Sequence, residues 1–500
     1  MTHGSAFAAR ARVAPVPVFL DLTGRDRVRR IALASGLVVA LVVYVNALAN
    51  GFVLDDGGVI VTNPPVTSPA TAWRAFALPY WPDDIGGGQY RPLGILTFAL
   101  DWQLSGGGPR WFHAVNVLWH AVATVLVGWL ALELLAPVAA GIAVILFAVH
   151  PVHVEAVSSV VGRLEPMATA LVLAAVLAHR RSTLWAPAFF ALALLSKESA
   201  IVLPVIVAAH DMMLERDWRS ALRSRRWLYA GYGGVALAYT ATVVAVFQDR
   251  ALTAPARALV GADAVQRLEI VARVVPHYVR LLVAPAELSA SYAPNVISPN
   301  PGFSVATAAG VAIVALFAVA LAVTLRGRRW PVMAFSLIWV PLALAPVSNV
   351  LFASGVVLAE RTLYLASVGV CLAAGAAAER YLVTRWTMVA AATASVVLAF
   401  GVRTWTRTPA WRDDRTYLLT LLADHPESYE AHLAAGRVLK GANSLEQADR
   451  ELVIARQLFP RDSVVFLEAA DVAQRRQRLK LAAALRDSAR LAPALPLLRR

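Results

Sequence analysis

The stretch IALASGLVVALVVYVNALA, residues 31–49, carries no charged side chain. A helix rises 1.5 Å per residue, so about 20 such residues cross the hydrocarbon layer of a bilayer. Similar runs recur along the chain, whose 500 residues are 58% hydrophobic and only 16% charged. Soluble domains carry about 25% charged residues. The sequence therefore predicts an all-α, polytopic membrane protein.

The flanks of residues 31–49 also resemble those of a signal peptide. Arginines precede the run, and Ala47-Leu48-Ala49 looks like a cleavage site. The apolar core of a signal peptide is only about 7 to 15 residues long, so we expect an uncleaved anchor. The net charge of +14 comes from short arginine clusters between apolar runs, which predicts topology signals and no nucleic-acid partner. The single Cys371 allows no intramolecular disulfide.

Basic residues accumulate on the cytoplasmic side of a membrane, and this rule orients the chain. It predicts a cytoplasmic tail over residues 1–30, a membrane domain over residues 31–405 and a first external loop over residues 51–110. About eleven spans follow: 31–49, 112–135, 137–149, 164–178, 184–195, 201–213, 227–247, 303–325, 331–351, 363–378 and 388–402. Short loops and the cysteine-poor exterior favour a bacterial plasma membrane over an endoplasmic reticulum.

Residues 265–284 are apolar but interrupted by charges, among them Arg267, Glu269 and Arg273. A full crossing would force the basic turn at residues 326–329 outside. We therefore expect an interfacial or re-entrant helix on the outer side.

Residues 411–500 are more charged and predict an external helical domain. Pro426, Pro460 and Pro493 are spaced by 34 and 33 residues, and a 34-residue period is typical of tetratricopeptide repeats. Generic helical hairpins are the alternative, because the second unit is less regular. A repeat domain would offer a surface for a protein partner.

Ionisable residues gather on the predicted outer face, where their cost near lipid suggests a function. Asp55 and Asp56 follow the first span, and crowding of like charges suits one of them to general-base work. Taken alone, such a pair is more often a helix cap. Other polar residues map to the same face: Tyr90, Arg91, His113, Asn116, His150, His153, Glu155, Arg163, Glu165, Lys197, Glu198, Glu360 and Arg361. Cations beside carboxylates are what an enzyme for a polyprenyl phosphate needs.

Several of these residues allow a second interpretation. His150, His153 and Glu155 are candidate ligands of a divalent metal or an ordering network for the loops. Lys197 with Glu198, and Glu360 with Arg361, are candidate ion pairs. His113 is either a site residue or a hydrogen-bonding partner of a neighbouring helix.

The order of these motifs resembles the transmembrane and tetratricopeptide-repeat O-mannosyltransferases, which are glycosyltransferases of the GT-C type related to the protein O-mannosyltransferases. The resemblance rests on Phe52 to Asp56, Asn63-Pro64-Pro65-Val66, Tyr90-Arg91-Pro92, Phe112-His113 with Asn116, His150 to Val157, Gly162-Arg163, Ser196-Lys197-Glu198, Pro346 to Asn349 and Ala359-Glu360-Arg361 with Leu363-Tyr364. It spans residues 51–460, and it implies a GT-C membrane bundle.

The resemblance implies inverting transfer of a sugar, mannose in that family, from a polyprenyl- or dolichyl-phosphate donor to a serine or threonine hydroxyl of a protein. Asp55 or Asp56 would orient or deprotonate the acceptor. Arg91, Arg163, Lys197 and Arg361 would neutralise the departing phosphate.

Two departures keep alternatives open. Relatives often carry aspartate where Glu165 stands, and they have many more repeats. Since a short array offers little surface for a polypeptide, a lipid or cell-wall glycan is an alternative acceptor. A membrane-anchored scaffold without catalysis is a further alternative.

Overall fold

The computed structural model describes residues 22–82, 88–248, 255–292, 294–298, 302–326, 330–351 and 353–492. Every regular element within these ranges is helical. Residues 1–21 of the predicted tail, residues 327–329 of the basic turn and Pro493 lie outside the described residues. The first helix begins at Leu22 and takes in the arginines that precede the apolar run, which are good helix formers.

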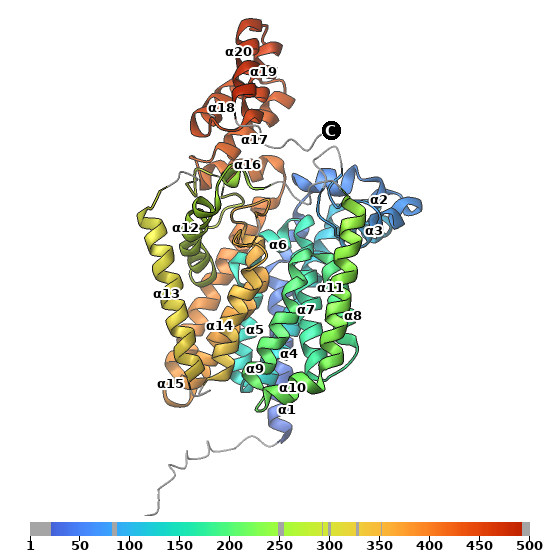
Figure 1. Ribbon diagram of the computed structural model, residues 1–500, viewed down its shortest axis with the longest axis vertical. Helices are drawn as coiled ribbons and strands as arrows, with labels where there is room; N and C mark the ends of the chain where they lie inside the picture. The colour runs from blue at the N-terminus through green and yellow to red at the C-terminus, as the bar shows by residue number, and fades with distance from the viewer. Residues whose placement is uncertain are drawn as a thin grey trace, which may run out of the picture.

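Long helices run side by side in a bundle (Figure 1). The helices up to the end of the bundle are α1 (Leu22–Val43), α2 (Pro64–Thr67), α3 (Pro92–Ser105), α4 (Pro109–Leu134), α5 (Pro137–Val149), α6 (Val154–Ser158), α7 (Leu164–Arg180), α8 (Trp185–Ser196), α9 (Leu203–Leu214), α10 (Trp218–Ser224), α11 (Arg226–Phe247), α12 (Ala264–Val283), α13 (Val305–Leu325), α14 (Pro331–Leu344) and α15 (Tyr364–Arg407). Short 3₁₀ or π turns connect several of them, at Val45–Ala49, Gly57–Val61, Pro69–Phe76, Val161–Arg163, Glu198–Val202 and Glu360–Leu363.

The described residues contain 6 helices that are long and apolar enough to cross a membrane, and 7 if α5 and the segment after it count as one span bent by 44°. The prediction of about eleven spans is therefore not established. Helices α8, α9 and α14 are shorter than the roughly 20 residues that a crossing needs, since proline or polar residues interrupt each apolar run. The chain is nonetheless a multi-pass membrane protein by its helices.

Helix α15 begins one residue into the span predicted over residues 363–378 and also contains the span predicted over residues 388–402. Its backbone leaves the helical conformation at Arg385, where φ is −143° and ψ is 42°. Residues from both halves line one cavity, so the chain folds back on itself there, at the lower end of the bundle (Figure 1). The first half packs closely on α14, because Gly369 leaves room for the backbone of Ser336: a Cβ there would lie 2.7 Å from the Ser336 carbonyl oxygen.

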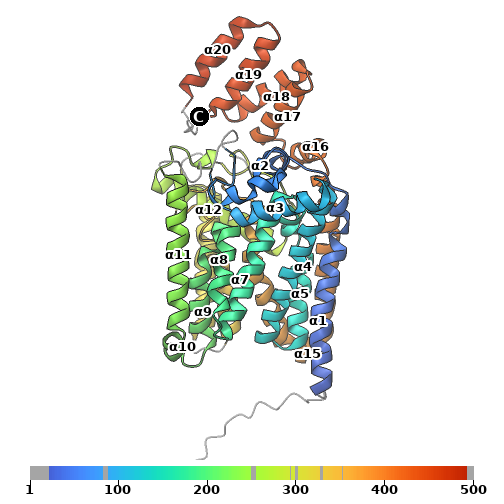
Figure 2. The same ribbon diagram turned by 90° about the vertical axis from the view of Figure 1, so that its right-hand side faces the viewer.

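The two ends of the bundle differ. The basic helix α10 and the start of α1 lie at one end, whereas α2, α3 and the C-terminal helices lie at the other (Figures 1 and 2). Helix α12, the predicted interfacial or re-entrant helix, lies beside α13 in the half nearer the C-terminal helices (Figure 1). It is not among the helices long and apolar enough to cross.

The C-terminal unit consists of α16 (Asp414–Asp424), α17 (Tyr429–Gly441), α18 (Leu445–Leu458), α19 (Ser463–Arg475) and α20 (Leu479–Leu491). Helices α17 and α18 pair, as do α19 and α20, around a core that includes Leu452 and Val465. The two hairpins begin at Tyr429 and Ser463, 34 residues apart. The unit stands on the end of the bundle that carries α2 and α3 (Figure 2).

Candidate functional site

A cavity of about 670 Å³ lies among the first loop, the start of α7, the turn after α8, helix α11 and the loop between α14 and α15. Seven of the predicted site residues line it: Asp55, Tyr90, Arg91, Glu165, Lys197, Glu198 and Arg361. They come from four of these segments: the first loop, the start of α7, the turn after α8 and the end of the loop between α14 and α15. The bundle therefore gathers most of the predicted charged residues around one space.

The two aspartates of the first loop have different environments. Asp55 lines the cavity, and its carboxylate has no hydrogen bond or ion pair with any residue that the structure describes. Asp55 is exposed to the cavity, yet the surrounding protein withdraws enough hydrating water to raise its pKa; Arg361 lowers this pKa and Glu155 raises it further. Asp56 is 1% exposed, and its carboxylate accepts the backbone N–H groups of Val53 and Val161, both at 2.9 Å.

Burial also raises the pKa of Asp56, to about 7, against the effect of those two hydrogen bonds. The contacts of Asp56 are backbone contacts, and it does not line the cavity. Of the pair, Asp55 is therefore the carboxylate that can meet a substrate, and Asp56 holds the loop.

Three cations face the cavity, and each is paired with a carboxylate. Arg91 contacts Glu198 through Nε and Nη2, at 2.8 and 2.6 Å. Lys197 pairs with Glu165, and Arg361 pairs with Glu155, whose other oxygen accepts the Arg361 backbone N–H at 2.8 Å.

The Arg91 pair and the Arg361 pair are the accessible ones. The Glu198 side chain is 42% exposed and that of Arg361 is 35% exposed, whereas Lys197 and Glu165 are both buried. Burial lowers the pKa of Lys197 and Glu165 raises it. Partial loss of hydrating water at the cavity wall would raise the pKa of Glu198, but Arg91 holds this pKa below its usual range.

Arg163 does not line the cavity, contrary to its predicted place beside a phosphate. It is 0% exposed and pairs with Asp101, and its Nε donates to the Asn116 side-chain oxygen at 2.7 Å. Asn116 donates in turn to the carbonyl of Ser159 at 2.7 Å. These residues join α3, α4 and the turn before α7, because a buried guanidinium needs a partner for its charge.

His113 and Glu360 likewise connect segments. The His113 ring contacts the Gly51 carbonyl oxygen through Nε2 at 3.0 Å. Glu360 accepts the Tyr292 hydroxyl at 2.8 Å and the Ser289 backbone N–H at 2.5 Å. Tyr90 lines the cavity while its hydroxyl donates to the Phe76 carbonyl at 2.9 Å.

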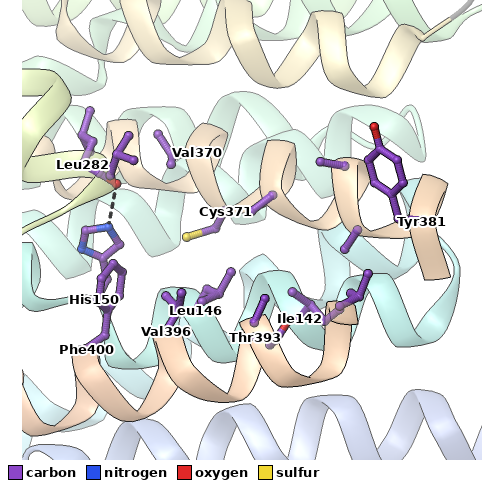
Figure 3. Close-up of a pocket in the computed structure, with 16 residues that line it drawn as sticks. Ile142, Leu146, His150, Leu282, Val370, Cys371, Tyr381, Thr393, Val396 and Phe400 are labelled. Atoms are coloured by element: carbon purple, nitrogen blue, oxygen red, sulfur yellow. Dashed lines mark hydrogen bonds between the residues drawn. The ribbon is translucent and has the colours of Figure 1, made fainter. Parts of the chain in front are cut away.

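The residues predicted to bind a metal do not converge. His150 Nε2 contacts the Leu282 carbonyl at 3.1 Å, His153 Nε2 contacts the Ser367 hydroxyl at 2.8 Å, and Glu155 is engaged by Arg361. His150 borders a second cavity of about 370 Å³ between α5, the end of α12 and both halves of α15, whose other walls are largely apolar (Figure 3). The three residues therefore do not fit a metal.

Another His and carboxylate cluster does bring its ligand atoms together. His210, Asp211 and Glu215 lie at the end of α9, close to α10. Their atoms already bind cationic partners, because Arg225 contacts both Asp211 and Glu215 and Arg180 contacts His210. This cluster holds helices together at the end of the bundle opposite the first cavity.

Sequence reasoning missed several residues that line the first cavity. Tyr80 and Trp81 of the first loop, Tyr239 of α11 and Ser354 are examples. The pair Tyr80-Trp81 and a tyrosine inside a span were visible signals, since aromatic residues with a polar group seek a hydrogen-bonding partner.

The motif Pro346 to Asn349 also has a place at this cavity. Pro346 and Val347 line it, while Asn349 adopts a left-handed conformation with φ of 62°. The Asn349 side chain accepts the Ser354 backbone N–H at 2.7 Å and donates to the Val356 carbonyl at 3.1 Å. Asparagine tolerates this backbone conformation and closes the loop beside the cavity.

The helical bundle defines a multi-pass membrane protein, and the described residues that line the charged cavity at one of its ends include one free carboxylate, Asp55, and three ion-paired cations. Over most of its length the chain is homologous to the TMTC protein O-mannosyl-transferases. It is 25% identical to protein O-mannosyl-transferase TMTC3 of Homo sapiens over 512 residues, which are 86% of this chain and 55% of the relative.

Two further relatives agree. Protein O-mannosyl-transferase F38B6.6 of Caenorhabditis elegans is 26% identical over 437 residues, 84% of this chain and 62% of the relative. Protein O-mannosyl-transferase Tmtc2 of Drosophila melanogaster is 39% identical over 196 residues, 35% of this chain and 21% of the relative. The chain thus spans 55% of the human relative and 62% of the Caenorhabditis elegans relative, and its match to Tmtc2 covers a smaller part still. No family model and no solved structure matches it.

Proposed function

We propose that the chain is an inverting glycosyltransferase that moves mannose from a polyprenyl- or dolichyl-phosphate donor to a serine or threonine hydroxyl of a protein. The observation that carries the proposal is the unpaired Asp55 carboxylate in a cavity with Arg91, Lys197 and Arg361. Mannose and the protein acceptor rest on the names of the relatives, which are protein O-mannosyl-transferases.

In the proposed reaction the acceptor oxygen attacks the anomeric carbon of the sugar. The bond between that carbon and the phosphate oxygen breaks, and its electron pair leaves with the lipid phosphate. Asp55 takes the proton of the hydroxyl, for which a raised pKa makes it a better base than an ordinary aspartate. A single displacement of this kind inverts the configuration at the anomeric carbon.

The departing phosphate needs cations that it can reach. Arg91 holds the two oxygens of Glu198 in the geometry that a guanidinium also offers to two phosphate oxygens. Glu198 is half open to the cavity, so a donor phosphate can displace it, and Arg361 adds a second accessible cation. Lys197 also lines the cavity, but it is buried and paired with Glu165, so its positive charge supports the site with less access to the phosphate than Arg91 or Arg361.

We place this cavity on the external face of a bacterial plasma membrane, with the N-terminus cytoplasmic and the C-terminal unit outside. The basic helix α10 and the start of α1 lie at the opposite end of the bundle, and basic residues prefer the cytoplasm. The C-terminal unit, with its two hairpins at a 34-residue interval, is proposed to be a short tetratricopeptide array that contacts a protein partner.

The proposal is tested with membranes that contain the full chain and a labelled polyprenyl-phosphate mannose. Label should pass to protein with the wild type and not with Asp55→Asn. The exposed carboxylate of Asp487 on α20 supplies the matched control, and Asp487→Asn should transfer as the wild type does. Equal labelling by Asp55→Asn would exclude Asp55 as the base, and label in glycan or lipid alone would exclude a protein acceptor.

A further inference from the structure

The segment that carries Asp55 lies along the end of α15, the turn that follows it and the first residue of α16, with which the C-terminal unit begins. Four hydrogen bonds join residues 46–54 to residues 405–414. Asn46 donates to the Trp405 carbonyl at 2.9 Å, Asn50 to the Thr408 carbonyl at 3.2 Å, the Gly51 backbone N–H to the Arg412 carbonyl at 2.8 Å and the Leu54 backbone N–H to the Asp414 carboxylate at 2.9 Å. These hydrogen bonds attach the beginning of the first loop to a segment some 360 residues further along the chain.

The approach at Gly51 is close. A Cβ at this position would lie 3.2 Å from the Arg412 carbonyl oxygen, so the two backbones touch where glycine stands. His113 contacts the Gly51 carbonyl from the other side at 3.0 Å. This end of the segment is therefore fixed by backbone and by α4.

Leu54 has an unusual conformation directly before Asp55. Its φ is 48°, in the left-handed region that a bulky residue rarely adopts because its Cβ crowds the following carbonyl. The turn from Val53 to Asp56 is closed by the Asp56 N–H, which donates to the Val53 carbonyl at 3.1 Å. Such a conformation persists only where the surroundings hold it.

Two carboxylates hold this turn, one at its start and the other at its apex. The Asp56 carboxylate binds the Val53 N–H and so fixes the start of the turn. The Leu54 N–H, at its apex, binds the Asp414 carboxylate, and the Leu54 side chain is itself 47% exposed and contributes little packing. Asp414 is the first residue of α16, where the helix end also favours a negative charge.

We infer that Asp414 is a positioning residue: its carboxylate holds Leu54 in the left-handed conformation and thereby aims Asp55 into the cavity. The C-terminal unit then contributes to the reaction through this contact, besides any partner it binds. The inference rests on the proposed role of Asp55. A shift of about 1 Å in a reacting group can lower a rate by roughly a hundredfold, so a loosened turn should act on the rate of transfer.

The test compares substitutions at the start of α16. Asp414→Ala should lower kcat about tenfold and leave the KM for the lipid-linked donor unchanged, because the cavity cations are untouched. Asp414→Asn keeps an oxygen that accepts the Leu54 N–H and should retain transfer. The matched control is Asp413→Ala, since Asp413 caps the same helix by accepting the Thr416 N–H at 2.8 Å and is not bonded to Leu54.

A second variant and a second measurement separate positioning from folding. In the double variant Asp414→Ala with Leu54→Gly, transfer should recover, because glycine adopts positive φ without strain. Amide hydrogen exchange of the peptide that contains Leu54 should speed up in Asp414→Ala and not in Asp413→Ala.

The inference is overturned if Asp414→Ala transfers and exchanges like the wild type, or if Asp413→Ala or Asp414→Asn loses as much as Asp414→Ala. The exchange measurement does not depend on the reaction. Absence of transfer by every form of the protein would therefore overturn the proposed function, while faster exchange in Asp414→Ala would still support the contact with Leu54.

Discussion

The Asp56 carboxylate accepts a hydrogen bond of 2.9 Å from the backbone N–H of Val161, 105 residues further along the chain. With its other oxygen on the Val53 N–H, Asp56 joins the first loop to the turn before α7. Asp55, its neighbour, is left to face the cavity. Two adjacent residues of one type thus have separable tasks.

Substitution of the two aspartates should separate those tasks. Asp55→Asn removes the base and should lower transfer by roughly a hundredfold to ten-thousandfold, with the midpoint of thermal unfolding unchanged. Asp56→Asn replaces one of two acceptors with an amide donor that faces a backbone N–H, which should destabilise the fold by about 1–3 kcal/mol. Transfer assays and unfolding in detergent measure both effects, and equal behaviour of the two variants would contradict the division.

Arg91→Lys should lower kcat/KM for the donor about tenfold, because an ammonium makes no two-pronged contact with phosphate. The comparison is with Arg437→Lys on α17, an exposed arginine that pairs with Glu468. Steady-state assays with a polyprenyl-phosphate mannose provide the measurement. Equal values for the two variants would show that the guanidinium shape at Arg91 is not used.

Glu198→Gln should lower the KM for the donor. Glu198 occupies Arg91 with two hydrogen bonds, and a neutral amide competes less well with an incoming phosphate. Titration of the initial rate with donor concentration gives the KM. A higher KM would mean that Glu198 supports donor binding directly.

On the acid side of the pH profile, the rate of transfer should fall at a pH above the pKa of an ordinary aspartate. Asp55 acts only when deprotonated, so transfer falls as the pH drops through its pKa, and desolvation by the protein around the cavity raises that pKa. Arg361 lowers the pKa of Asp55, so Arg361→Met should move the acid limb to still higher pH. Lys197→Met serves as the comparison and should move it less. A shift to lower pH in Arg361→Met would rule out Asp55 as the titrating group.

Gly162→Ala should destabilise the protein. An added Cβ would lie 2.7 Å from the Glu155 carbonyl oxygen and 2.8 Å from that of Ala156, and both are backbone atoms. The cost expected from such overpacking is about 1–3 kcal/mol, read from thermal unfolding. Gly233→Ala on α11 is the matched control, because a Cβ there meets nothing within 4 Å.

Much of the site could be predicted from the sequence. Alternation of apolar runs and basic loops assigns each polar residue to one end of the bundle, and Asp55, Arg91, Lys197 and Arg361 meet there as expected. The same reasoning also assigned Arg163 and His153 to the site, but the structure buries both residues between helices. The sequence predicts how far along a membrane helix a residue lies. Whether its side chain faces the cavity or a neighbouring helix depends on how the helices pack.

The span count shows a similar limit. Hydropathy detects apolar runs, but the 12 residues of α8 end at the polar turn that lines the first cavity, and the 12 of α9 end at the polar cluster of His210, Asp211 and Glu215 at the opposite end of the bundle. In the C-terminal unit the second hairpin looked irregular because its packing positions vary in residue type. Its helices nonetheless begin at Ser463 and Leu479, each 34 residues after its counterpart at Tyr429 and Leu445.

The bond between Leu54 and Asp414 joins residues 360 positions apart. At about 5 to 20 residues per second, a ribosome makes the second partner roughly 20 to 70 seconds after the first. Until then the Leu54 N–H has no acceptor. The turn before Asp55 therefore lacks one of the hydrogen bonds that hold it in the complete protein. With the role proposed here for Asp55, transfer begins only after the start of α16 has been made, and a chain that stalls before Asp414 remains inactive in the membrane.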